Sequence, residues 1–297
     1  MSDQSHLPPE ALVIDDDGAQ LGVLDHDDDG PSPNLPSAAT TRYVYAIGRI
    51  DPRFPTLAVE KEFAQVAGRG ETTGLTDREA LRSLLGERQN RYLLRELCWA
   101  FTVGGVDTYV LQPNDPVDFD QLLDAVRPRP QATDIDVVIG VLGPLAPPEL
   151  CNGLTLPIVG FDQIYSFDID SLLSSIPRPK GMKADEFRPA AEDLFSLIAQ
   201  MTDNAGATDA DRALNYLSVR YPAMYHESAE RLAEDASLTG VEVRPSPLSG
   251  ARTIVDVVFS YTNRRTDVVD KRFVRVDVTE EFPFLVSKLA PYFDREL

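Results

Sequence analysis

Alternating apolar and polar residues mark a pair of strands between Arg252 and Glu281. One face of the first strand carries β-branched and aromatic side chains, at Val255, Val257, Phe259 and Tyr261. The second strand repeats the pattern at Val274, Val276 and Val278. Because the side chains of a strand alternate between its two faces, this period of two predicts a half-buried antiparallel hairpin that turns through residues 262–266.

The residues before and after this hairpin are expected to form helices and a further strand that pack with it. Residues 187–201, 208–221 and 225–232 carry apolar side chains every three or four positions, which predicts three helices. Val241 and Val243 are expected to begin a third strand beside the hairpin. Pro283 is expected at the start of a final helix that covers the sheet with Phe282, Leu285, Val286 and Leu289.

The preceding half of the sequence also mixes strands with helices. Residues 43–50 are typical of a strand, and Thr76 with Glu79 forms a capping box that predicts the start of a helix. Two glycines at positions 104–105 separate two apolar runs and predict a tight hairpin turn. Residues 135–143 are apolar almost throughout, as in a strand covered on both faces.

Together these elements predict an α+β fold in which helices pack on antiparallel β hairpins in two subdomains, with a C-terminal β-meander covered by a final helix. The boundary between the subdomains is expected at residues 177–183, where two prolines and a glycine disfavour continuous helix. We therefore expect a disordered acidic tail at residues 1–42, one α+β domain at 43–176 and a second at 184–297.

The charge of the sequence restricts its partners. The 297 residues include 48 Asp and Glu against 28 Lys and Arg, a formal net charge of −20. Because this excess of negative charge repels phosphate groups, we expect neither nucleic acid nor an anionic membrane among the partners, which leaves proteins, peptides and small molecules. No apolar run approaches the length that crosses a bilayer and no secretory signal begins the sequence, so we expect a cytoplasmic protein.

Nine of the acidic residues lie in residues 1–40, which contain five Pro and neither Lys nor Arg. This composition predicts a solvated, disordered tail, with a short docking motif as the alternative. The tail includes half of a calcium-loop pattern, but Pro36 stands where such a loop needs a bidentate Glu. The matching positions are Asp25, Asp27, Asp29 and Gly30. We therefore expect no metal and no other cofactor.

The two cysteines, Cys98 and Cys151, lie far apart in the sequence, and we expect two buried free thiols rather than a disulfide. A role in metal binding stays open. The sequence contains no serine-hydrolase, phosphate-loop, dinucleotide or zinc-protease motif, so we expect no enzyme and no catalytic residue. The alternative is an unrecognised enzyme with its site in the loop 144–157, around Glu149, Cys151 and Asn152.

The other side chains that could transfer protons are expected to have no catalytic role. His226 lies in a helical segment and is expected to be a partly exposed side chain. Neighbouring carboxylates, such as Asp168 with Asp170 and Glu280 with Glu281, are expected by chance among 48 acidic residues.

One series of arginines forms a positively charged group in a chain whose net charge is negative. It occupies two successive predicted helices, at Arg78, Arg82, Arg88, Arg91 and Arg95. Spacings of three or four residues place subsets of the series on common faces, where guanidinium groups can bind the carboxylates of an acidic partner or of the tail itself. The alternative is a solvated face with local ion pairs to Glu79 and Glu87. Arg264 and Arg265, at the tip of the C-terminal hairpin, are candidates of the same kind.

Five segments carry a resemblance to a known family. They are YVYAIGRIDPRFPTLAVEKEFAQ (43–65), DIDVVIGVLGPLAPPELCNG (134–153), FDQIYSFD (161–168), NAGATDADRALNYLSVRYPAMY (204–225) and IVDVVFSYTNRRTDVVDKRFVRVDVTEEFPFLVSKLAPYF (254–293). In this order they resemble the noncatalytic C-terminal region of cyanobactin maturation proteases of the PatA/PatG type. Residues 43–176 resemble the PatG middle region, and residues 184–297 resemble the PatG C-terminal domain.

In that family the region follows a subtilisin-like protease domain and has no established activity. The resemblance implies a dimer-forming accessory module in ribosomal-peptide maturation. Because the subtilisin-type Ser, His and Asp motifs are absent here, neither protease activity nor any catalytic residue is transferred. We expect a standalone, non-enzymatic accessory or scaffold protein that forms homodimers and holds a peptide or a maturation enzyme, with a structural subunit of a larger assembly as the alternative.

Overall fold

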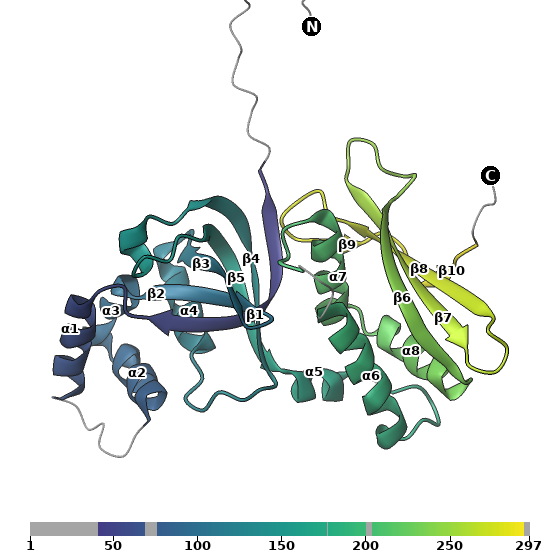
Figure 1. Cartoon of the computed structure of the whole chain (residues 1–297), viewed down its shortest axis with the longest axis horizontal. Helices are drawn as coiled ribbons and strands as arrows, with labels where there is room; N and C mark the ends of the chain where they lie inside the picture. The colour runs from purple at the N-terminus through teal and green to yellow at the C-terminus, as the bar shows by residue number, and fades with distance from the viewer. Residues whose placement is uncertain (1–40, 69–75, 177, 200–203, 294–297) are drawn as a thin grey trace, which may run out of the picture. The chain divides into compact units, whose positions relative to one another are not determined.

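The computed structural model describes residues 41–68, 76–176, 178–199 and 204–293. The α+β class is confirmed, because helices pack against two sheets that are mostly antiparallel (Figure 1). The acidic tail and the calcium-like pattern from Asp25 to Gly30 lie outside the described residues. The expectations for that segment stay predictions.

The first sheet is a closed barrel of five strands, in the order β1-β2-β3-β5-β4. They are β1 (Tyr43–Arg53), β2 (Cys98–Val103), β3 (Val106–Pro113), β4 (Asp134–Leu145) and β5 (Pro157–Asp168). Neighbouring strands are antiparallel except for β3 and β5, which are parallel. With a helix between β3 and β4, this is the Greek-key arrangement of OB-fold barrels.

Helices fill the connections of the barrel. Those between β1 and β2 are α1 (Leu57–Ala67), α2 (Asp77–Gly86) and α3 (Leu93–Glu96), while α4 (Phe119–Ala125) precedes β4. The predicted capping box begins α2, since Thr76 N donates to Glu79 Oε2 at 2.9 Å and Glu79 N donates to Thr76 Oγ1 at 3.3 Å. The barrel interior and these helices share one apolar core, in which Trp99, Phe101 and Phe161 are buried.

Residues 146–156, between β4 and β5, fold over the outer face of β2 and β3. Cys98 and Val110, which alternate with the interior residues of their strands, pack there against Ala146 and Cys151. A disulfide joins Cys98 to Cys151, whose Cα atoms are 5.1 Å apart. The expectation of two free thiols is therefore wrong, because the pairing of β3 with β5 brings the loop back beside β2 despite the long separation in sequence.

The second sheet contains β6 (Ala236–Pro245), β7 (Ile254–Asn263), β8 (Val269–Asp277), β9 (Phe284–Leu285) and β10 (Ala290–Pro291). The predicted hairpin is β7 with β8, and the apolar face predicted for it is buried. Three predicted helices belong to the same core (Figure 1): α6 (Ala184–Ala199), α7 (Asp209–Arg220) and α8 (Ala223–Ala233). The short α5 (Ile169–Ser175) follows the last barrel strand.

The predicted final helix is wrong. After the buried Pro283, the chain forms β9 and β10, which pair with β8 instead of covering the sheet. Leu285 and Leu289 still pack on the core, but Phe282 and Val286 are exposed. The helical spacing of this segment was misleading, because the segment pairs as strands with the edge of β8 and so satisfies the backbone groups there.

One core cluster draws residues from both sides of the predicted boundary at 177–183. Tyr45, Val137 and Ile139 of the barrel pack with α6, α7 and the second sheet. Gly206 seals the contact, since its oxygen accepts from Tyr45 N at 2.8 Å and its φ is +75°. A Cβ at Gly206 would lie 2.4 Å from the Tyr45 oxygen, so only glycine fits. The two-domain division stays a prediction.

Candidate functional site

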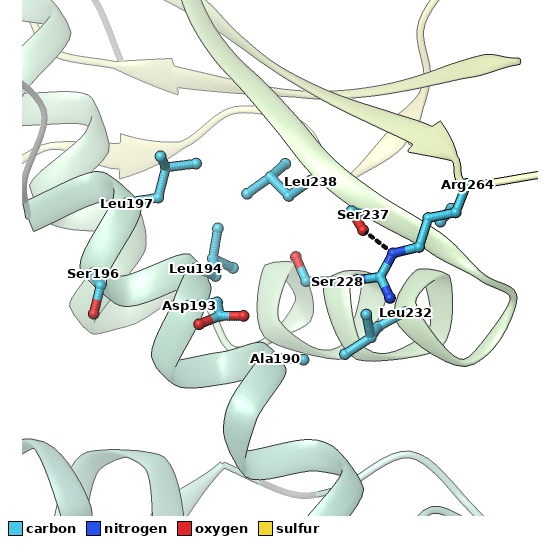
Figure 2. A pocket seen from close by; sticks show the side chains of 11 residues that line it. Ala190, Asp193, Leu194, Ser196, Leu197, Ser228, Leu232, Ser237, Leu238 and Arg264 are labelled. Atoms are coloured by element: carbon cyan, nitrogen blue, oxygen red, sulfur yellow. Dashed lines mark hydrogen bonds between the residues drawn. The ribbon is translucent and has the colours of Figure 1, made fainter. Parts of the chain in front are cut away.

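A pocket of about 390 Å³ lies between α6, α8 and the start of β6 (Figure 2). Leu194, Leu197 and Leu238 gather at one end, and Arg264 reaches the other end from the tip of the β7–β8 hairpin (Figure 2). The pocket therefore joins an apolar wall to a cationic group, and Asp193 of α6 also lies in its lining. Of the residues expected to bind a partner, Arg264 is the one that lies here.

Helix α6 gives the pocket the side chains that its own apolar stripe leaves outside. Leu194 and Ile198 are buried in the core, whereas Leu197 is 40% exposed and Asp193 is also exposed. An exposed leucine beside the partly buried Leu238 offers apolar surface to a ligand. Sequence reasoning missed Leu197 because it lies one position outside the stripe that predicted the helix.

The hairpin tip holds Arg264 in place. Asn263 Oδ1 accepts hydrogen bonds from Arg265 N at 2.9 Å and Thr266 N at 3.0 Å, and Arg264 N donates to the Asp235 oxygen at 2.8 Å. The Arg264 side chain donates from Nε to Ser237 Oγ at 2.6 Å, which orients the guanidinium along the pocket (Figure 2). The position of this cation is set by its backbone and by one neutral hydroxyl.

Two adjacent arginines have different electrostatic surroundings. Arg265 forms an ion pair with Asp235, whereas no carboxylate among the described residues pairs with Arg264. The charge of Arg264 is therefore available to an anion that enters the pocket. This contrast makes Arg265 a matched control for Arg264.

The wall of the pocket also contains a pair of hydroxyl groups. Ser228, a buried hydroxyl in its wall, shares a hydrogen bond of 2.9 Å with Tyr261 Oη. Burial raises the pKa of Tyr261 to about 12, so this phenol keeps its proton near neutral pH. The guanidinium beside the apolar wall fits a carboxylate that has an apolar side chain next to it.

The arginines of the first helices mostly bind groups of this chain, and three of them, Arg82, Arg91 and Arg95, contact α4 or the residue that follows it. Arg78 pairs with Asp51 at 3.1 Å, and Arg91 pairs with Asp120 at 2.9 Å. Arg82 donates to the Val126 oxygen at 3.0 Å and also binds Leu123 and Asp124 at the C-terminal end of α4. These three side chains have partners within the chain.

Arg88 and Arg95 differ from them. Arg88 is exposed and forms no ion pair with another described residue, while the Arg95 guanidinium lies 6.0 Å from the ring centroid of Phe119. Glu79, proposed as a local partner of the series, pairs with Arg129 at 2.7 Å instead. A partner-binding role for the series stays a prediction.

Sequence reasoning passed over a pair of carboxyl groups, Asp162 and Glu281, that interact electrostatically. Glu281 follows β8 and faces Asp162 of β5. Burial first, and the Asp162 carboxylate second, raise the pKa of Glu281 to about 7, while the nearby Arg212 opposes the shift. Arg212 is itself buried and donates to the Val278 oxygen at 2.7 Å, which fixes the segment. Because the two acids are far apart in sequence, no local pattern indicates the pair.

The alternative enzyme site at residues 144–157 loses its nucleophile. Cys151 is buried in the disulfide, so it has no thiolate, and Asn152 ends a short 3-10 helix in the left-handed conformation, with φ of +49°. Among the described residues, no group of three or more His, Cys, Asp and Glu is placed to hold a metal ion. The same part of the chain contains no helix long and apolar enough to cross a membrane.

Two comparisons with known proteins found a match. The family model described as "PatG C-terminal" matches residues 181–292. A solved structure described as "PatG Domain of Unknown Function" is similar with a TM-score of 0.67 and 20% identity, covering 84% of this chain and 98% of that chain. At this identity the likeness shows the fold.

None of the curated proteins matches this chain. The predicted resemblance is nevertheless confirmed by the family model and by the shared fold. The matched structure is described as a domain of unknown function and not as a catalytic protease domain. The chain carries a PatG C-terminal-type region, and the pocket at Arg264 lies within it.

Proposed function

We propose that this protein is a non-enzymatic accessory or scaffold protein that binds peptide or protein partners in ribosomal-peptide maturation of the cyanobactin type. The pocket at Arg264 supports the binding role, because this arginine lies beside an apolar wall and has no carboxylate partner in the described part of the chain. The pathway and the homodimer are proposed from the resemblance to PatG, whose C-terminal family model matches residues 181–292. We also propose that the protein is cytoplasmic.

The pocket favours a peptide that carries a carboxylate next to an apolar side chain. The guanidinium of Arg264 binds the carboxylate through charge-assisted hydrogen bonds, and the apolar side chain packs against Leu197 and Leu238. The protein has a net charge of −20, so long-range electrostatics disfavour a ligand with many negative charges. A ligand with a single carboxylate fits both conditions.

The barrel supports the exclusion of nucleic acid. OB-fold barrels that bind oligonucleotides use the face of β2 and β3 together with the neighbouring loops. Here residues 146–156 cover part of that face, and the disulfide between Cys98 and Cys151 holds them there. A fold alone does not assign a function. The support for this exclusion therefore comes from the loop that covers the face and not from the barrel fold itself.

Peptide binding is tested by fluorescence polarisation with a labelled hexapeptide, Thr-Val-Thr-Val-Thr-Leu, which has a free C-terminal carboxylate. We expect Arg264→Ala, and also a C-terminal amide on the peptide, to weaken binding about tenfold or more, as loss of a charge-assisted hydrogen bond does. The matched variant Arg265→Ala should bind within about twofold of the parent, because Arg265 is paired with Asp235. Equal effects of the two variants, or no binding by the parent, contradict the proposal.

The homodimer is tested separately by light scattering on a gel-filtration column. A dimer has twice the 32.8 kDa mass of the chain. A monomer contradicts this part of the proposal, and higher assemblies favour the alternative of a structural subunit.

A further inference from the structure

We propose that the edge of β6 accepts the bound peptide as an additional strand, antiparallel to β6, with the C-terminal carboxylate of the peptide at Arg264. This inference rests on the proposed function and adds how the main chain of the ligand is held. Strand addition gives affinity through backbone hydrogen bonds and specificity through alternate side chains.

β6 is the end strand of its sheet. The strand order is β10-β8-β7-β6, and β6 pairs with β7 alone among the described residues. Within β6 only Ala236 is buried, whereas the first six residues of β7, from Ile254 to Phe259, are all buried. The outer backbone groups of β6 therefore have no strand partner in the described part of the chain, and such an edge is a template for pairing.

The opposite edge of the sheet is occupied. β9 pairs with Val276 and Asp277 of β8, and β10 pairs with Arg272 and Phe273. The chain thus covers one edge of this sheet with its own C-terminal segment and leaves the other without a partner strand among the described residues. An extended ligand has one long edge to join, which is β6.

The pocket lies at the start of this edge. Ala236, Ser237 and Leu238 of β6 line it together with α6, so a strand added to β6 passes between the sheet edge and the helix. Arg264 binds Ser237, at the N-terminal end of β6. A peptide whose C-terminal carboxylate meets Arg264 must run from the far end of β6 toward Ser237, which makes the pairing antiparallel.

A bulge and a proline limit the register. The pairing of β6 with β7 shifts between Leu238 and Gly240, and Thr239 Oγ1 donates to the Ser260 oxygen at 3.2 Å there. The bulge keeps Leu238 and Val241 on the same side of the sheet, where both pack against the core. Pro245 ends β6, so the added strand pairs between Ser237 and Val243.

The alternation of a strand sets which ligand residues are apolar. If the C-terminal residue packs against Leu197 and Leu238, the residue two positions earlier points to the same side. The ligand is therefore an extended peptide with apolar residues at its last and third-from-last positions. The residues between them face away and are free to be polar.

The test uses two versions of the hexapeptide Thr-Val-Thr-Val-Thr-Leu that are N-methylated on alternate amides. One version is methylated at the second and fourth residues, and the other at the third and fifth. In an added strand only one of these sets of N–H groups faces β6, so one version should bind about tenfold or more weakly and the other close to the parent. Each version controls for the effect of methylation on the free peptide.

Amide hydrogen exchange gives a second readout. On binding of the parent peptide, exchange should slow between Ser237 and Val243 and remain unchanged at β10. If both methylated peptides bind like the parent while Arg264→Ala still weakens binding, strand addition is overturned and the proposed function stands. If the parent peptide does not bind, both are overturned. If an amidated C-terminus binds like the free acid, the carboxylate does not lie at Arg264 and the proposed direction is wrong.

Discussion

The barrel and the second sheet differ in whether their edge strands are paired. The barrel closes on itself through β1 and β4, so every strand has two neighbours. The second sheet stays open, and within the described residues β6 has one neighbouring strand. Closure removes the backbone groups that another chain would use, whereas an open edge presents them. The strand addition that we propose therefore uses the open sheet in the C-terminal part of the molecule.

The two regions also differ in how their loops are held. A disulfide pins residues 146–156 onto the barrel, while the tip of the β7–β8 hairpin is held by hydrogen bonds and by the ion pair of Arg265. A covalently held loop keeps one conformation and therefore fits a structural role. A hydrogen-bonded tip that presents Arg264 suits a binding site.

The largest expected effects come from the cores of the two regions. Phe101 in the barrel and Phe259 in the sheet are both completely buried, so Phe101→Ala and Phe259→Ala should each lower the free energy of unfolding by about 3–5 kcal/mol. Because Tyr45 and Val137 join the barrel to the other core, we expect one unfolding transition. Urea titrations followed by circular dichroism and by the fluorescence of Trp99, the one tryptophan, should therefore coincide. A Phe259→Ala curve that shifts by circular dichroism but not by Trp99 fluorescence would show two independent domains.

The disulfide, which lies in the barrel, should matter nearly as much. Replacing both cysteines, Cys98→Ala with Cys151→Ala, opens a loop of 53 residues and should cost about 4 kcal/mol, mainly through the entropy of the unfolded chain. The measurement is the urea midpoint of the double variant against the oxidised parent. Two titratable thiols in the denatured, unreduced parent would contradict the bond itself.

The sequence predicted the parts of the fold that depend on local patterns. The β7–β8 hairpin follows from strict alternation, and the start of α2 follows from Thr76 and Glu79. These signals are local because a strand face or a helix cap is decided within a few residues. The class of fold could be predicted for the same reason.

The parts that depend on distant contacts could not be predicted. The residues from Phe282 to Leu289 have helical spacing, yet the edge of β8 turns the segment into strands. Cys98 meets Cys151 because β3 pairs with β5, which brings residues 146–156 back beside β2. Arg264 was identified as a candidate, but its neighbours Leu197 and Leu238 come from elements whose packing no local pattern reveals.

A smaller effect is expected where the two regions meet. Asn215 Nδ2 donates to the Tyr45 oxygen at 2.8 Å, and Asn204 Nδ2 donates to Asn215 Oδ1 at 2.9 Å, with both amides buried. Asn215→Ala leaves buried polar groups without partners and should cost about 1–3 kcal/mol. The exposed Gln89→Ala serves as the control and should change stability by less than about 0.5 kcal/mol. A thermal or urea midpoint equal to that of the control would show that the network does not hold the regions together.

The smallest effect is expected from pH, through Glu281. The pKa of this carboxyl is raised from 4.5 to about 7 in the folded protein, so the folded state holds a proton that the unfolded state has released between these values. Stability should therefore fall as the pH rises from about 4.5 to about 7, and Glu281→Gln should remove this fall. Because the carboxyl is partly exposed, solvent screening limits the change to about 1 kcal/mol or less. Urea midpoints at pH 5 and pH 7.5 give the measurement, with Glu280→Gln as a control for the loss of one charge. A parent whose stability drops no more than that of Glu281→Gln across this interval would mean that Asp162 and Glu281 do not couple the barrel to the sheet.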